Sequence, residues 1–277
     1  MSMLLEPIQV RAHRGAGPIV VVLHGGPGAP GSAAGLARAL AGEFHVLEPL
    51  QRRSGTVPVT VGQHVADLAA VAPDVATLVG WSWGAMLALS FAARRPERVR
   101  AIALVGCGTY DETSRALYRR VMDARLGRDG RLRMRQFEDA LDRERDAAAR
   151  DRLLIAVGEL AAEAQAWDRV AGDEDDAHDV DAPLADARGQ TETWQDALRL
   201  QREGVEPAAF ERIRVPVLML HGNHDPHPGQ MTRDVLRRFM PQLEYVGFEA
   251  CGHEPWRERD ARGPFLVALR AWLRSAG

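Results

Sequence analysis

The segment TLVGWSWGAMLALSFAA at residues 77–93 decides how this chain folds. An apolar run typical of a buried strand ends at Gly80, and a helical pattern begins at Trp83. Gly80 and Gly84 stand two residues on either side of Ser82, where they let strand and helix approach without a Cβ clash. A serine at such a sharp strand-to-helix turn has a strained backbone and a hydroxyl that projects from the sheet. Ser82 is therefore the candidate nucleophile.

Apolar strand runs and helical patterns alternate along most of the chain, which is typical of a parallel sheet covered by helices. The segments expected as strands are 19–23, 44–47, 77–80, 99–105, 215–220 and 244–248. Helices are expected at 32–41, 61–71, 83–93, 231–240 and 264–274. The run at 19–23 is apolar throughout, as in strands buried on both faces. The sequence thus predicts an α/β protein with a mostly parallel central sheet flanked by helices.

The strand pattern nearly vanishes between residues 109 and 209, where Arg, Ala, Glu and Asp follow helical spacing. This region contains the acidic run GDEDDAHDVDAP at 172–183, which we expect to form a mobile loop. Because the alternation of strands and helices resumes at 215, we interpret 109–209 as an inserted helical cap. The core domain then consists of 1–108 and 210–277.

Composition excludes several classes of function. The 277 residues are 46% hydrophobic, enough for a sizeable core. With 35 basic and 38 acidic residues the net charge is −3, which does not favour nucleic acid as a partner. The two cysteines, Cys107 and Cys251, rule out a disulfide scaffold, suit a reducing compartment and are expected to fill the core. Without a leader pattern or a membrane-length apolar run, we expect a cytoplasmic protein with no membrane partner.

A nucleophilic serine needs a base, and the base needs an orienting carboxylate. Asp225 follows the expected strand at 215–220, and His253 follows the one at 244–248. Both therefore lie past the carboxyl ends of parallel strands, the edge where ligands bind in open α/β sheets. Alternatively, Asp225 caps the next helix and His253 is an ordinary loop residue, but both accidents would have to coincide. We predict the catalytic residues Ser82, Asp225 and His253.

Acyl chemistry also needs N–H donors aimed at the developing oxyanion. The backbone N–H of Trp83, directly after the nucleophile, is one candidate. The second is the N–H of Gly26 in the loop HGGPG at 24–28, since Pro27 has no N–H to donate. An alternative interpretation of this loop is a plain Gly/Pro turn.

The same loop offers a competing interpretation. The glycines at 26, 28 and 31 match the dinucleotide-binding pattern G-x-G-x-x-G, and Glu48 lies where a ribose-binding acid would follow. Pro27 and Pro30, however, remove N–H groups from the stretch that would cradle a pyrophosphate. A metal site built from His221, His224, Asp225 and His227 has no spacing typical of zinc ligands, and HDPHPG is typical of a turn. We therefore expect neither a cofactor nor a metal.

Four motifs together resemble a known family. They are HGGPG at 24–28, GWSWGAMLAL at 80–89, HGNHDPHPG at 221–229 and CGHEPW at 251–256. The chain is similar to the α/β-hydrolase superfamily, most closely to its proline iminopeptidase-like branch. The resemblance implies an α/β-hydrolase fold, a cofactor-free serine mechanism, and the catalytic roles given above. It departs from the branch at LQRRSG (50–55), where an Asp-Gln-Arg-Gly run is usual, and at Trp81, where glycine is usual.

Two substrate classes remain open, small carboxylic esters and short peptides with a free amino terminus. Peptidases of the branch bind that amine with cap carboxylates, for which the candidates here are Glu163, Asp173, Glu174, Asp175, Asp176 and Glu192. Four tryptophans indicate either an aromatic-lined substrate pocket or packing in the core. They are Trp81, Trp83, Trp194 and Trp256. A third possibility is a ligand-binding receptor of the same fold. The sequence leaves the natural substrate and the oligomeric state open.

Overall fold

A computed structural model describes residues 6–170 and 185–276 of the chain. Within these ranges the chain forms a seven-stranded sheet in the order β1-β3-β2-β4-β5-β6-β7. The strands are β1 (Val10–His13), β2 (Ile19–Leu23), β3 (His45–Pro49), β4 (Ala76–Trp81), β5 (Val99–Val105), β6 (Val217–Gly222) and β7 (Leu243–Phe248). β1 runs antiparallel to β3, and every other neighbouring pair is parallel. The predicted fold class, a mostly parallel sheet flanked by helices, is confirmed.

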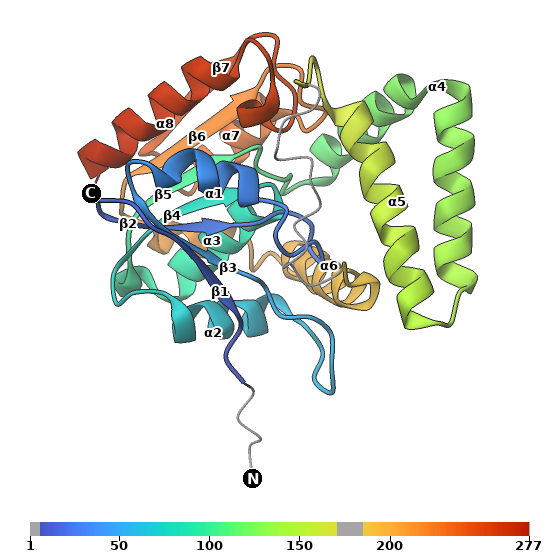
Figure 1. Ribbon diagram of the computed structural model, residues 1–277, viewed down its shortest axis with the longest axis horizontal. Helices are drawn as coiled ribbons and strands as arrows, with labels where there is room; N and C mark the ends of the chain where they lie inside the picture. The colour runs from blue at the N-terminus through green and yellow to red at the C-terminus, as the bar shows by residue number, and fades with distance from the viewer. Residues whose placement is uncertain (1–5, 171–184, 277) are drawn as a thin grey trace.

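Helices cover both faces of the sheet (Figure 1). On one face lie α1 (Ala34–Ala41) and α8 (Arg262–Ala276), and on the other lie α2 (Val61–Val71), α3 (Trp83–Arg94) and α7 (Gly229–Arg237). Successive strand residues point to opposite faces. Leu78 of β4 accordingly packs into the cluster around α3, while its neighbour Val79 packs into the cluster around α8. β4, which ends directly before Ser82, is thus packed between the two apolar layers.

Among the described residues between β5 and β6, three α-helices form the inserted helical region. They are α4 (Glu112–Arg143), α5 (Ala147–Gln165) and α6 (Ala187–Arg202). Each begins at an aspartate, namely Asp111, Asp146 and Asp186, whose carboxylate accepts a hydrogen bond from a backbone N–H of the first turn. α4 bends at Gly127, where φ is +63°. In Figure 1 α4 and α5 project away from the sheet, whereas α6 lies beside the core.

α6 belongs to the core in its packing. Its buried residues Ala197 and Leu200 join the same apolar cluster as α2 and α3. α4, by contrast, buries only Ser114 and Met122 among the residues of that helix. The acidic run predicted as a mobile loop, 172–183, falls outside the described residues. In the parts of the chain that the structure describes, no helix combines the length and the hydropathy needed to cross a membrane.

Candidate active site

Ser82 occupies the sharp turn between β4 and α3. Its φ of 55° and ψ of −119° lie in a region that residues with a side chain rarely adopt. The Ser82 N–H donates to the carbonyl of Val105 at the end of β5, 2.9 Å away. A Cβ on Gly84 would come within 2.2 Å of the Leu23 carbonyl, and one on Gly80 within 2.3 Å of the Gly84 carbonyl. Only glycines at both positions let the turn close, which holds the serine in this conformation.

Asp225 and His253 lie together at the same edge of the sheet. The His253 Nδ1 and the Asp225 Oδ2 are 2.6 Å apart, and both side chains are buried. The imidazole lies against Gly106, where a Cβ would come within 3.0 Å of Nδ1. Gly106 follows Val105, whose carbonyl holds the Ser82 N–H. Within the described part of the chain, no hydrogen bond joins the Ser82 hydroxyl to His253; the pair that is bonded is the histidine and the aspartate.

Asp225 is surrounded by imidazoles. Its Oδ1 accepts hydrogen bonds from the backbone N–H and the Nδ1 of His227, both at 2.9 Å, and its Oδ2 lies 3.2 Å from Nε2 of His221. Burial disfavours the charged carboxylate, but the neighbouring histidines outweigh it and hold the pKa of Asp225 well below its usual value. Burial also disfavours the charged form of His253, which would lower its pKa, but the Asp225 charge raises the pKa of His253 above the usual value. Asp225 is thus arranged to support a protonated His253.

The loop after β2 passes directly over Ser82. A Cβ on Gly25 would lie 3.3 Å from the Ser82 Cβ, and Gly26 has a φ of +106°, which favours glycine. His24 anchors this loop: its Nδ1–H donates to the Gly25 carbonyl at 2.9 Å, and its Nε2 accepts from the Gln51 N–H at 3.0 Å. Burial lowers the pKa of His24 to about 4, which keeps the ring neutral and able to accept that bond.

Gln51 connects this loop to α3, the helix that begins directly after Ser82. Its side-chain amide donates to the His24 carbonyl at 3.0 Å and accepts from the Trp83 indole N–H at 2.8 Å. Sequence reasoning missed both His24 and Gln51 as site residues. Gln51 lies in the run LQRRSG, whose only signal in the sequence is a departure from a family pattern.

Comparison with known proteins decides the family. The model described as the Alpha/beta hydrolase family matches residues 20–263. The chain belongs to the alpha/beta hydrolase family. The predicted enzyme class, a hydrolase, is confirmed by this match and by relatives that carry esterase names.

Two relatives share one name. A pimeloyl-[acyl-carrier protein] methyl ester esterase of Chromobacterium violaceum is 42% identical over 95 residues, covering 33% of this hydrolase and 37% of that protein. Its namesake in Nitrosomonas europaea is 27% identical over 252 residues, covering 87% and 91%. Among solved structures, a thermophilic esterase from Thermogutta terrifontis has a TM-score of 0.60 at 20% identity and covers 97% and 93%, a similarity of fold. The narrower resemblance to proline iminopeptidases gains no support from these names.

The tryptophans of the hydrolase occupy different environments. The Trp81 indole N–H donates to the His253 carbonyl at 3.1 Å, and the two rings lie 5.5 Å apart. Trp256 packs edge-on against Trp81 and is only 2% exposed, within the core cluster around α8. Trp83 is equally buried, and Trp194 packs against the core cluster around α3. Trp81 therefore contacts the candidate base directly, while the other three have packing partners in the core.

The cap carboxylates have varied surroundings in this hydrolase. Glu192 accepts a hydrogen bond from the Val59 N–H at 2.9 Å and pairs with Arg188 at 2.7 Å, which ties α6 to the segment before α2. Glu163 is exposed on α5. The remaining candidates, Asp173, Glu174, Asp175 and Asp176, lie outside the described residues.

Cap and core meet beside His253. The backbone N–H of His253 donates to the Gln165 carbonyl at the end of α5, 3.1 Å away. The buried Glu258 accepts from the Trp167 and Asp168 N–H groups of the cap at 2.9 and 2.7 Å, and from the Gly252 N–H at 2.9 Å. A small cavity lies at this junction, lined by Ala162, Gln165, Ala166, Arg169, His253, Glu254, Arg257 and Glu258.

The residues weighed for a metal or a nucleotide have other partners in this hydrolase. Possible ligand atoms of Asp225, His227 and His253 lie within 4.8 Å of one another. A carboxylate accepts hydrogen bonds, so the Nδ1 atoms of both imidazoles carry their protons toward Asp225. Glu48 is fully buried and binds Arg11 at 2.9 Å and His13 at 3.2 Å, which joins β3 to β1.

Proposed function

We propose that this hydrolase cleaves an ester bond of a small substrate through a Ser82–His253–Asp225 triad and an acyl-enzyme. The observation that carries the proposal is the 2.6 Å bond between His253 Nδ1 and Asp225 Oδ2. This pair lies at the carboxyl edge of the sheet, against the strand ends that hold Ser82 at a φ of 55°. A neutral His253 that donates through Nδ1 keeps Nε2 free to accept a proton.

The proposed reaction has two steps. His253 Nε2 takes the Ser82 proton as Oγ attacks the carbonyl carbon, and the backbone N–H groups of Gly26 and Trp83 stabilise the oxyanion. His253 then gives the proton to the departing alcohol, which leaves an acyl group on Ser82. In the second step His253 activates a water molecule, which releases the acid and restores the serine. The negative charge of Asp225 stabilises the imidazolium of His253 in both steps.

Esters are proposed over peptides because of two observations. The relatives matched over 95 and 252 residues are both named as methyl ester esterases. In addition, Glu192, which a peptidase would use for the substrate amine, is engaged by Val59 and Arg188. A methyl or other short-alcohol ester of a carboxylic acid is therefore the first substrate class to test.

The experiment compares kcat/KM for short-chain nitrophenyl esters, methyl esters and a prolyl anilide, with Ser82→Ala as the control variant. We expect ester hydrolysis by the wild type and its loss in Ser82→Ala. Preference for the prolyl anilide would replace the esterase by an aminopeptidase. Saturable binding without turnover of any substrate would instead make the protein a receptor.

A further inference from the structure

His227 holds the carboxylate oxygen of Asp225 that His253 does not use. Its backbone N–H and its ring Nδ1 both lie 2.9 Å from Oδ1, whereas His253 Nδ1 lies 2.6 Å from Oδ2. His227 thus donates two hydrogen bonds to Oδ1, one from its main chain and one from its side chain. The carboxylate plane is thereby fixed from the side opposite the base, and its charge is shared by imidazoles on both oxygens.

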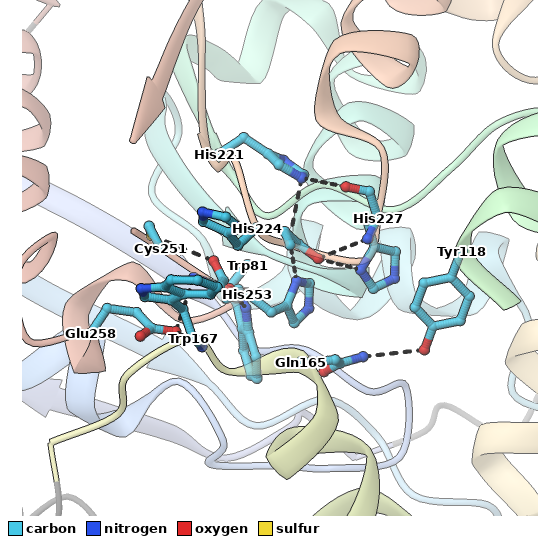
Figure 2. A network of polar contacts seen from close by, with 12 residues as sticks. Trp81, Tyr118, Gln165, Trp167, His221, His224, His227, Cys251, His253 and Glu258 are labelled. Carbon is cyan, nitrogen blue, oxygen red and sulfur yellow. Dashed lines mark hydrogen bonds and ion pairs between the residues drawn. The ribbon is translucent and has the colours of Figure 1, made fainter. Parts of the chain in front are cut away.

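The ring of His227 also stacks on the ring of His253. Their centroids are 4.5 Å apart with an angle of 24° between the planes. On the other face of His227 lies Tyr118 of α4, with centroids 4.3 Å apart and an angle of 30°. Figure 2 shows the three rings in a row, with His227 in the middle. His227 therefore fills the space between the cap and the catalytic base.

The cap closes a loop of contacts around this stack. The Tyr118 hydroxyl accepts a hydrogen bond from the Gln165 side chain at 3.2 Å, and the Gln165 carbonyl accepts from the His253 N–H at 3.1 Å (Figure 2). α4 and α5 consequently hold His253 from two directions, through its main chain and through the ring of His227.

Resting on the triad of the proposed function, we propose that His227 is a positioning residue. Backed by Tyr118 of the cap, it orients Asp225 and the ring of His253, and it limits how strongly Asp225 stabilises the protonated base. This role explains why a carboxylate that needs one histidine partner is engaged by a second on its other oxygen. It also gives the cap a direct effect on catalysis.

The groups around His227 set the sign of the expected pH effect. His253 and Asp225 face it within its own site, His221 donates to its carbonyl at 2.9 Å, and α4 contributes Tyr118 and Arg125. A farther charge that acts on His253 is that of Glu254, and the buried Cys107 thiol beside Asp225 stays neutral because burial raises its pKa. Burial lowers the pKa of His227, so at neutral pH it is a neutral donor that withdraws charge from Asp225. Without that donor, Asp225 supports the imidazolium of His253 more strongly, and the acidic limb moves to higher pH.

The test compares His227→Leu, which loses the ring donor, with His227→Gln, which can keep an N–H donor. For His227→Leu we expect kcat to fall about tenfold to a hundredfold with little change in KM, and the acidic limb of kcat/KM to move to higher pH. His227→Gln should recover part of both effects. The matched control is His224→Gln, because His224 belongs to the same loop and stacks on Trp167 of the cap at 3.8 Å without bonding Asp225.

Each outcome of this test decides the inference. An unchanged pH profile in a folded His227→Leu overturns the proposal, as does an equal shift in His224→Gln. Should His227→Leu fail to fold, Tyr118→Leu decides instead, with Tyr118→Phe as its partner that keeps the ring: a displaced profile in Tyr118→Leu alone supports the proposal, and no displacement overturns it. Loss of activity in Ser82→Ala with unaltered His227 variants rejects only this inference, whereas an active Ser82→Ala rejects the triad itself.

Discussion

The substitution Asp225→Asn tests the orienting carboxylate most sharply, because the site has N–H donors on both sides of this residue. Oδ1 faces the N–H and Nδ1 of His227, and Oδ2 faces Nδ1 of His253 and Nε2 of His221. An asparagine offers one acceptor oxygen, so its NH2 group must oppose the donors on one side. If the NH2 group faces His253, the imidazole keeps its proton on Nε2 and can no longer act as a base.

The loss of charge adds to the loss of geometry. The Asp225 charge raises the pKa of His253 above its usual value, so the neutral amide removes the support for the imidazolium. We expect kcat/KM of Asp225→Asn to fall about 10³- to 10⁴-fold, equivalent to about 4–5.5 kcal/mol of transition-state stabilisation. The assay is hydrolysis of a nitrophenyl ester across the pH range, with the folded state checked by urea unfolding.

The matched control is Asp67→Asn. Asp67 is also a buried aspartate, but it binds Arg52 at 2.7 and 2.8 Å rather than a histidine. Its loss should lower the free energy of unfolding and leave kcat/KM within about threefold of the wild type. Retention of more than a tenth of the wild-type kcat/KM by Asp225→Asn would refute the role of Asp225 as the orienting carboxylate.

Three further predictions concern the surroundings of the triad. The acidic limb of the wild-type kcat/KM profile should lie above pH 6.5, because Asp225 raises the pKa of His253 and activity is lost as the pH falls through that pKa. An acidic limb below pH 6.5 would contradict the pairing of His253 with Asp225. Gly106→Ala should reduce kcat at least about tenfold, since its Cβ would press on the His253 ring at 3.0 Å and φ is +53°, and normal kcat in this variant would place the base elsewhere. Gln51→Ala should lower the free energy of unfolding by about 1–3 kcal/mol in urea titrations, because it leaves the buried His24 carbonyl and the Trp83 indole N–H without their side-chain partner. An unchanged midpoint would show that these two bonds are dispensable.

The sequence predicted the core of the fold well where burial and capping agree. α2 and β5 have the expected bounds, 61–71 and 99–105. Thr60 caps α2, and all but one residue of β5 is buried. β1 was missed because Val10–His13 is a short edge strand with half-exposed side chains, and it carries no apolar run.

Strand ends at the active edge were less predictable. β6 was expected at 215–220 but spans Val217–Gly222, where His221 and Gly222 pair with β7. These polar and small residues continue the strand because they pair with residues of β7. An apolar sequence pattern does not reveal such pairing. The same limit applies to the site, since strand-end residues come from distant segments.

Candidate site residues could be predicted from the sequence where a local motif exists. The contacts that support them could not be predicted, because they join residues far apart in the chain. Ser82 stands in a five-residue motif, whereas the bonds of Gln51 to His24 and Trp83 join residues 27 and 32 positions apart. His227 is an intermediate case. Its N–H bond to the Asp225 side chain is a local turn that the spacing of two residues predicts, but its stack between Tyr118 and His253 depends on the folded cap.

The central claim, that Ser82 carries the acyl group, is tested most directly by mass spectrometry of the protein quenched during turnover of a nitrophenyl ester. We predict a mass increase of one acyl group, located in the peptide that contains Ser82 and absent from Ser82→Ala. Steady turnover by Ser82→Ala, or an acyl group on another residue of the wild type, would contradict it.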